Sequence, residues 1–146
     1  MATTPWALVT GASSGLGVEY ARSLARSGHN LILVARNHDR LTVLATALAQ
    51  EFSVECEVLL ADLHTSQDVA RVSQRLCDIA KPVRVLINNA GYGIPGHLAQ
   101  SDASVERDHL AIHVIAPLEL TKAALPGMLE RGEGRGVFVS SVAGYL

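Results

Sequence analysis

The sequence predicts an α/β fold in which a doubly wound, mostly parallel sheet carries helices on both faces. Short apolar runs alternate with amphipathic segments along all 146 residues, which is the pattern of parallel strands joined by crossover helices. The apolar runs are nearly continuous, as expected for strands that are covered on both sides. No interdomain linker, low-complexity tract or long internal repeat is visible, so we expect a single domain over residues 1–146.

The first strand and the turn that follows it organise the chain. Trp6 to Thr10 is a short apolar run, and Gly11-Ala12-Ser13-Ser14-Gly15-Leu16-Gly17 follows directly. Glycines allow a tight turn and a close approach of the backbone to a ligand. The first N–H groups of the next helix have no partner within it, and the helix dipole adds positive charge there. Such a strand–turn–helix junction is suited to a pyrophosphate.

The remaining elements follow in alternation. Leu16, Ala21, Leu24 and Ala25 predict a helix that ends at Ser27-Gly28. Further strands are expected at 31–35, 54–60, 83–87 and 137–140. Three more helices are expected: one on Leu41, Leu44, Ala45, Leu48 and Phe52; one on Val69, Val72, Leu76 and Ile79 that ends at Pro82; and a long one over 104–131. Thr65 and Asp68 resemble a capping box. The apolar stripe of the long helix is Leu110, Val114, Leu118, Thr121, Leu125 and Met128, with bends at Pro117 and Pro126 and a polar loop over 130–136.

Composition excludes several classes of function. Apolar residues make up 49 % of the chain, which indicates a folded core. A net charge of −2 gives no electrostatic argument for nucleic acid or an anionic membrane. The amino terminus lacks a signal-type apolar segment, and two cysteines make neither a disulfide framework nor a metal-type spacing. We therefore expect a cytoplasmic protein without nucleic-acid or membrane partners.

Polar residues occur at the carboxyl ends of several predicted strands. The glycine turn follows the first strand, Asp62 the third, Asn88-Asn89-Ala90-Gly91 the fourth, and Ser140-Ser141 the fifth. In open parallel sheets, ligands bind beyond these ends. The sequence thus predicts one nucleotide site at this edge. A P-loop nucleotidase is a weaker interpretation, because Leu16-Gly17-Val18 stands where that motif needs Lys followed by Ser or Thr.

These motifs together resemble the short-chain dehydrogenase/reductase family over essentially the whole chain, which implies a Rossmann-like NAD(P)-binding domain. By this resemblance, Thr10, Gly11, Ser13, Ser14, Gly15, Leu16 and Gly17 hold the cofactor pyrophosphate. Asp62 with Leu63 approaches the adenine ring, and Asn89, Ala90 and Gly91 support the sheet and line the cofactor ribose. The resemblance also implies a homo-oligomer built partly on the long helix.

The end of the second strand favours NADP over NAD. NAD enzymes place an acidic residue there to hold the ribose 2′-hydroxyl, whereas this chain has Ala35-Arg36, with Arg40 one helical turn later. Arginine pairs with a phosphate, and a carboxylate would repel it. The alternative is that Arg36 and Arg40 are solvated surface charges.

The catalytic residues that the family uses are only partly represented. The resemblance makes Ser141 the substrate-oxygen ligand, although a turn or cap hydroxyl is the alternative. The family's Tyr-x-x-x-Lys pair is absent, since Tyr145 is only four residues after Ser141 and no lysine follows it. His113 stands where the family usually has an Asn of the proton relay. We expect the amino-terminal part of a longer chain, truncated at its carboxyl end with the later strands missing, and inactive by itself.

Two functional hypotheses remain. The first is an NADP-dependent oxidoreductase that exchanges a hydride with a small carbonyl or alcohol substrate. The second is a catalytically dead module that binds a nucleotide or a protein partner. His109 and His113 have the spacing of a metal pair, but no third ligand is suitably placed, so helix packing is the favoured interpretation and no metal is expected.

Overall fold

The computed structural model describes residues 4–145 and shows a five-stranded parallel sheet in the order β3-β2-β1-β4-β5. The strands are β1 (Trp6–Thr10), β2 (Asn30–Ala35), β3 (Cys56–Leu60), β4 (Val83–Asn88) and β5 (Arg135–Phe138). The helices are α1 (Gly15–Arg26), α2 (His38–Phe52), α3 (Ser66–Leu76), α4 (Ala103–Leu110) and α5 (Ala116–Arg131). The predicted doubly wound α/β class is confirmed.

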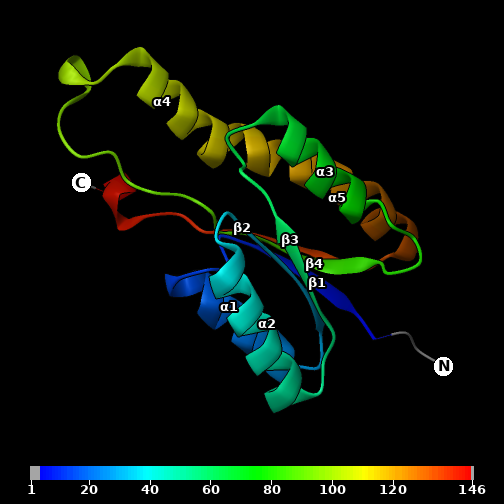
Figure 1. The fold of residues 1–146 in the computed structure, drawn as a ribbon. Coiled ribbons are helices and arrows are strands. Elements are labelled where there is room, and N and C mark those ends of the chain that lie inside the picture. Colours follow the sequence, from blue (N-terminus) through cyan, green and yellow to red (C-terminus); the bar gives the residue numbers. More distant parts are fainter. Residues whose placement is uncertain (1–3, 146) are drawn as a thin grey trace.

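Helices cover both faces of the sheet. Helices α1 and α2 lie on one face and α3 and α5 on the other, while α4 projects beyond the sheet (Figure 1). The period of a strand divides its residues between two cores. In β2, Leu31 and Leu33 face the α1/α2 core, whereas Ile32 and Val34 face the α3/α5 core. Burial on both faces explains why the strand sequence is uninterrupted in its apolar character.

Helix α3 is shorter than the sequence predicted. Val69, Val72 and Leu76 are buried as expected, but the helix ends at Leu76, before Pro82. The Asp78 side chain accepts a hydrogen bond from the Ala80 amide at 2.8 Å, which forms a competing turn after the helix. Ile79 is consequently 91 % exposed, and its predicted place in the apolar stripe is wrong.

Most of the predicted apolar face of the long helical region is also wrong, although Met128 is buried as predicted. Residues Ala111–Ile115 form a π-helical turn, η2, between α4 and α5. The buried positions there are Ile112, Ala116, Leu120, Ala124 and Met128, whereas Leu110, Val114, Leu118 and Leu125 of the predicted stripe are exposed. A π turn shifts the helical register, and small Ala116 and Ala124 let the helix approach the core closely.

The bounds of strands β5 and β3 also differ from the prediction. Strand β5 occupies Arg135–Phe138, two residues earlier than expected, because α5 ends sharply at Gly132 in a left-handed conformation. The polar loop is therefore shorter than predicted. Strand β3 begins at Cys56 instead of residue 54.

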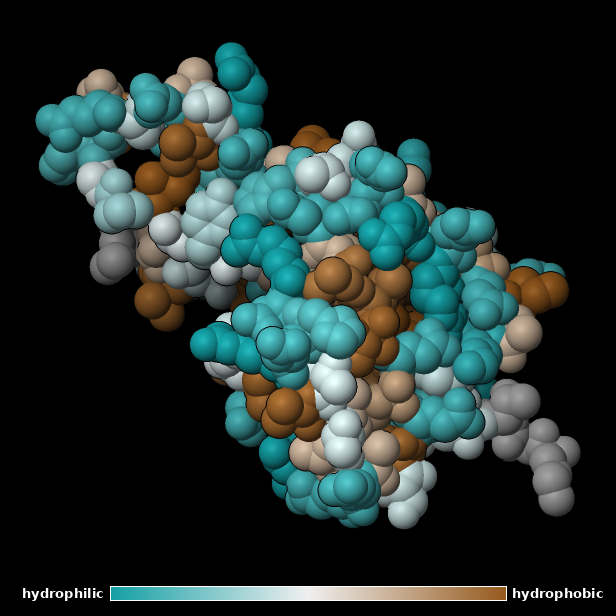
Figure 2. All heavy atoms as spheres, in the orientation of Figure 1, coloured by the Kyte–Doolittle hydropathy of each residue, from teal (hydrophilic) through white to brown (hydrophobic). Residues whose placement is uncertain are grey.

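The surface contains exposed apolar side chains in two places. Figure 2 shows apolar surface over the edge strand β3 and on α4. Leu60 of β3 and Val105 and Leu110 of α4 are among the exposed apolar residues. Within residues 4–145, no helix combines the length and the apolar character that crossing a membrane requires.

A cluster of charges surrounds Trp6 at the amino end of the sheet. Arg75 and Lys81 lie 5.2 and 4.8 Å from the Trp6 ring centre and bind Glu57 at 2.7 and 3.1 Å. Burial raises the pKa of Glu57, but the hydrogen bonds from Arg75 and Lys81 outweigh it and hold that pKa below its usual value.

We expect this cluster to make the fold less stable in acid. Because the Glu57 pKa is lower in the folded chain, its stabilisation is fully present above the unfolded value of about 4.3 and is lost as the pH falls through the folded value. Urea unfolding at pH 7 and pH 3.5 checks this expectation. Glu57→Gln should reduce the pH dependence and the exposed control Glu19→Gln should not; an unchanged dependence in Glu57→Gln contradicts it.

Candidate functional site

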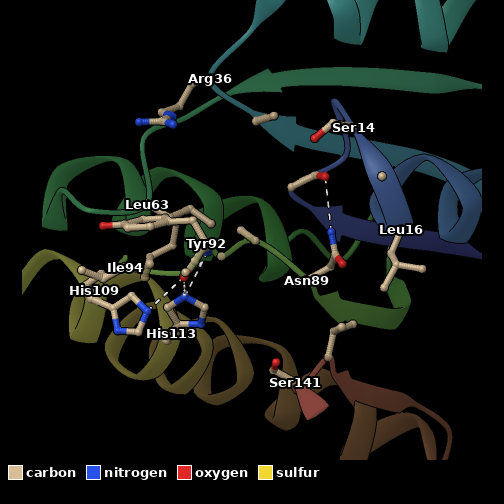
Figure 3. A pocket seen from close by; sticks show the side chains of 18 of the residues that line it. Ser14, Leu16, Arg36, Leu63, Asn89, Tyr92, Ile94, His109, His113 and Ser141 are labelled. Atoms are coloured by element: carbon tan, nitrogen blue, oxygen red, sulfur yellow. Dashed lines mark hydrogen bonds between the residues drawn. The ribbon is translucent and has the colours of Figure 1, made fainter. Parts of the chain in front are cut away.

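A cleft of about 1640 Å³ lies along the carboxyl ends of the strands. Fourteen of the sixteen predicted site residues line it: Gly11, Ser13, Ser14, Gly15, Leu16, Arg36, Arg40, Asp62, Leu63, Asn89, Ala90, Gly91, His113 and Ser141. Thr10 and Gly17 do not line it and are buried beneath it. Figure 3 shows these residues around the cleft: Ser14 and Leu16 at the start of α1, Arg36 after β2, Asn89 after β4 and Ser141 after β5. The structure therefore brings the predicted residues together, and their roles remain predictions.

The junction between β1 and α1 has no room for a side chain at Gly11 or Gly17. A Cβ atom on Gly17 would lie 2.1 Å from the Gly11 carbonyl oxygen, and one on Gly11 would lie 2.8 Å from the Ala90 Cα. Ser14 precedes α1 in an extended conformation, and its side chain makes no capping hydrogen bond. The first amides of α1 are thus left for an anionic group in the cleft.

Thr10 and Asn89 join the turns after β1 and β4. The Thr10 hydroxyl accepts hydrogen bonds from the Asn89 and Ala90 amides at 2.9 and 3.0 Å and donates to the Ile87 carbonyl at 3.3 Å. The Asn89 amide group donates to the Thr10 and Gly11 carbonyls at 3.1 and 3.3 Å. These bonds fix the glycine turn against the Asn-Asn-Ala-Gly turn, as the supporting role predicted for Asn89 requires.

The end of β2 presents two arginines to the cleft. Arg36 and Arg40 both line the cleft. Figure 3 shows Arg36 at the edge of the cleft, at a distance from Ser14 at the start of α1. The Asn37 side chain caps α2 by accepting a hydrogen bond from the Arg40 amide at 3.0 Å. The cap fixes the start of α2 and with it the position of the Arg40 backbone.

The end of β3 carries Asp62 in a defined orientation. Its Oδ1 atom lies 2.6 Å from Nδ1 of His64 and accepts the His64 amide at 3.1 Å. One half of the predicted capping box forms, because the Thr65 hydroxyl accepts a hydrogen bond from the Asp68 amide at 3.3 Å. The other half does not form, because the Asp68 carboxylate accepts from the Asp62 amide at 2.7 Å instead. The hydrogen bond from His64 lowers the pKa of Asp62 against the opposing effect of burial.

Two histidines of the α4–η2 segment hold the loop after β4. His109 Nε2 lies 3.0 Å from the Tyr92 carbonyl oxygen. His113 Nε2 lies 2.9 Å from the same oxygen and 3.1 Å from the Tyr92 amide nitrogen, so its tautomer decides which group it bonds. The two rings lie side by side, with centroids 4.3 Å apart (Figure 3). Among residues 4–145, no three potential metal ligands cluster here or elsewhere.

Ser141 lies on the cleft wall after β5 (Figure 3). Its hydroxyl accepts a hydrogen bond from the Ala143 amide at 3.1 Å. Ser141 therefore acts as a turn hydroxyl, which is the alternative role that the sequence left open. A hydroxyl has a second acceptor site and a proton to donate, so the turn role does not occupy its whole hydrogen-bonding capacity.

The sequence alone does not reveal that His64 connects two residues of the cleft lining, Asp62 and Tyr92. His64 lies in the loop between β3 and α3, where its side chain is only 15 % exposed and bonds both Asp62 and, through Nε2 at 3.1 Å, the Tyr92 hydroxyl. The available signal was its position directly after Asp62-Leu63. That signal is weak without the structure, because Tyr92 is 28 residues away in the sequence.

We expect Gly91 and His113 to be energetically coupled. A Cβ atom on Gly91 would lie 2.3 Å from Cε1 of His113. Gly91→Ala should therefore destabilise the fold by about 1–3 kcal/mol, as overpacking does, and much less when His113→Ala is also present. A double-mutant cycle measured by urea unfolding checks this coupling. Equal costs of Gly91→Ala in both backgrounds contradict it.

The sheet order, the glycine turn and the cleft at the strand ends define a Rossmann-like α/β protein. Residues 5–146 match the family model of the short chain dehydrogenases. The chain belongs to the short-chain dehydrogenase/reductase family, as its motifs predicted.

Curated relatives resemble the chain at about one-third identity. The chain is 34 % identical over 139 residues to human "inactive hydroxysteroid dehydrogenase-like protein 1", covering 93 % of this chain and 42 % of that protein. It is 35 % identical over 143 residues to a very-long-chain 3-oxoacyl-CoA reductase of Aspergillus fumigatus, covering 97 % of this chain and 41 % of that protein. The chain thus spans less than half the length of these relatives.

Solved structures agree closely with the fold. The bulky-bulky ketone specific alcohol dehydrogenase of Comamonas testosteroni is 40 % identical with a TM-score of 0.93, covering 99 % of this chain and 57 % of that one. A short-chain dehydrogenase of Sphingobium yanoikuyae in complex with NADPH is 40 % identical with a TM-score of 0.92, covering 97 % and 55 %.

Proposed function

We propose that this chain binds NADP(H) in the cleft and forms the cofactor-binding part of an oxidoreductase acting on a carbonyl or alcohol substrate. The observation that carries the proposal is the pair Arg36 and Arg40 at the carboxyl end of β2, both lining the cleft. In NAD enzymes an acidic residue at this point binds the ribose diol, whereas arginines complement a 2′-phosphate. The relative from Sphingobium yanoikuyae was solved with NADPH.

The described groups fit the parts of such a cofactor. The uncapped amides at the start of α1, with Ser13 and Gly15 beside them, would hold the pyrophosphate. Asp62 and Leu63 would meet the adenine ring, and the Asn89–Gly91 turn would line the ribose. The cofactor supplies the hydride, and the protein supplies binding, orientation and a proton.

The catalytic chemistry is represented by Ser141 and His113. The Ser141 hydroxyl would hold the substrate oxygen, and the His113 imidazole would take the place of the family's Asn, if it leaves the Tyr92 backbone. No Tyr-x-x-x-Lys pair occurs among the 146 residues. We therefore propose that these residues alone bind the cofactor without turning over substrate.

Fluorescence titration tests the proposal. NADPH should bind more tightly than NADH, and neither a bulky ketone nor a small aldehyde should cause NADPH oxidation by this chain. Absence of NADPH binding overturns the proposal. Ketone reduction by the chain alone overturns its inactivity.

A catalytically dead module is the second candidate. It is favoured by one of the relatives, whose name describes it as inactive. The coding sequence beyond codon 146 discriminates the two. A Tyr-x-x-x-Lys pair shortly after Leu146 supports the enzyme, and a stop codon there supports the binding module.

We also propose that the exposed helical face makes a homo-oligomer. Leu110, Val114, Leu118, Leu125 and Leu129 leave 43–75 % of their surface exposed. Apolar surface of this kind on a soluble chain is typical of a contact site. Light scattering should give at least twice the monomer mass, and a monomer at high concentration contradicts this.

A further inference from the structure

The side chain of His64 has hydrogen-bond partners on both sides. Nδ1 lies 2.6 Å from Asp62 Oδ1, and Nε2 lies 3.1 Å from the Tyr92 hydroxyl. The ring is 15 % exposed, and it packs 5.6 Å from the Tyr92 ring. His64 thus links the turn after β3 to the loop after β4, across the cleft edge.

The chemistry of the partners assigns the protons along this link. An ionised carboxylate only accepts hydrogen bonds, so Nδ1 of a neutral His64 carries the hydrogen and Nε2 has the lone pair. The Tyr92 hydroxyl must then donate to Nε2. The order is therefore Asp62 carboxylate, His64 Nδ1–H, His64 Nε2, and Tyr92 O–H.

This arrangement fixes the Asp62 carboxylate from one side only. Oδ1 accepts both the His64 amide and the His64 ring, and the Asp62 amide is bound by Asp68. Among residues 4–145, no hydrogen bond engages Oδ2, and the Asp62 side chain is 41 % exposed at the cleft. An oriented, exposed carboxylate oxygen accepts from an amino group, and the exocyclic amine of adenine is such a donor.

We propose that His64 is a positioning residue for adenine recognition, which orients Asp62 so that Oδ2 accepts the adenine amino group. This inference rests on the proposed NADP(H) binding. A side chain already held in its binding orientation loses less conformational freedom when the ligand arrives. His64 itself touches no ligand in this role, and the Tyr92 hydroxyl fixes the far side of its ring.

Binding of adenosine 2′,5′-bisphosphate, which carries the adenine and the 2′-phosphate, provides the test by calorimetry. His64→Ala should weaken binding about tenfold, the effect of losing one hydrogen bond to a charged group. His64→Asn should recover most of the affinity, since its amide nitrogen replaces Nδ1. His29→Asn, before the opposite end of β2, is the control and should leave affinity unchanged.

Each outcome decides between the two levels of the proposal. Tight binding by the native chain with no loss in His64→Ala overturns the positioning role and leaves NADP(H) binding intact. Equal losses in His64→Ala and His64→Asn also overturn it, because they indicate a packing effect. Failure of the native chain to bind the bisphosphate overturns both proposals.

A measurement on the native chain guards against a variant that fails to fold. Nitrogen-15 NMR of labelled histidine, at a pH where imidazole is neutral, should show the hydrogen of His64 on Nδ1, which faces the Asp62 carboxylate. The resonance of Nε2 should change in Tyr92→Phe, which removes the donor hydroxyl. A hydrogen on Nε2 in the native chain overturns the proposal.

Discussion

Replacing both Arg36 and Arg40 by alanine should weaken NADPH binding about 100-fold and leave NADH binding nearly unchanged. Each guanidinium is expected to make a charge-assisted bond to the 2′-phosphate, and losing one such bond costs roughly tenfold in affinity. Both arginines line the cleft at the end of β2. Fluorescence titrations with the two cofactors measure the effect.

The single change Arg36→Asp sharpens this prediction. A carboxylate there would repel the phosphate and offer an acceptor to the ribose diol, so the preference should move toward NADH. Arg107→Ala is the control, because Arg107 is exposed on α4 and does not line the cleft. If the double variant keeps its NADPH affinity, the two arginines are the solvated surface charges that the sequence left as an alternative.

Replacing Gly17 by alanine should destabilise the fold by about 3 kcal/mol, at the upper end of overpacking effects. The added Cβ would lie 2.1 Å from the Gly11 carbonyl oxygen and 2.8 Å from the side-chain nitrogen Nδ2 of Asn89. The Gly11 carbonyl belongs to the turn after β1 that lines the cleft, and a backbone carbonyl cannot rotate away as a flexible side chain can. NADPH affinity should fall together with stability.

Urea unfolding and cofactor titration of Gly17→Ala measure the two effects. Gly93→Ala is the matched control, because nothing lies within 4 Å of a Cβ at Gly93, although Gly93 lines the same cleft. Native stability in Gly17→Ala contradicts the prediction. A comparable loss in Gly93→Ala shows that the effect is not specific to the packed turn.

Local sequence patterns predicted the sheet well because the apolar character of each strand indicates how deeply that strand is buried. The continuous apolar run 31–35 indicated coverage on both faces, and Leu31 to Val34 are divided between the two cores. The α4–α5 region gave a misleading pattern instead. Leu118 and Leu125 have the apolar character of core residues, but a π turn and the small residues Ala116 and Ala124 place another face inward. The size and apolar character of its side chains do not by themselves reveal which face of a helix packs against the sheet.

The candidate site also has features that local sequence patterns predicted and features that they did not. Glycine turns and polar residues at strand ends are local signals, and the parallel order of the strands brings those ends together. The anchoring of Tyr92 by His64, His109 and His113 depends on contacts across 17 to 28 residues of sequence. No single segment contains both partners of such a contact.

The sequence by itself determined the α/β class, the family, and the residues that gather at the carboxyl edge of the sheet. These features could be predicted because glycines indicate the local backbone conformation and apolar runs indicate which strands are buried. Only the tertiary structure decided which face of α5 is buried and that His64 bonds Tyr92 across 28 residues of sequence. Those features depend on packing and hydrogen bonds between segments, and such energies arise only when the segments meet in space.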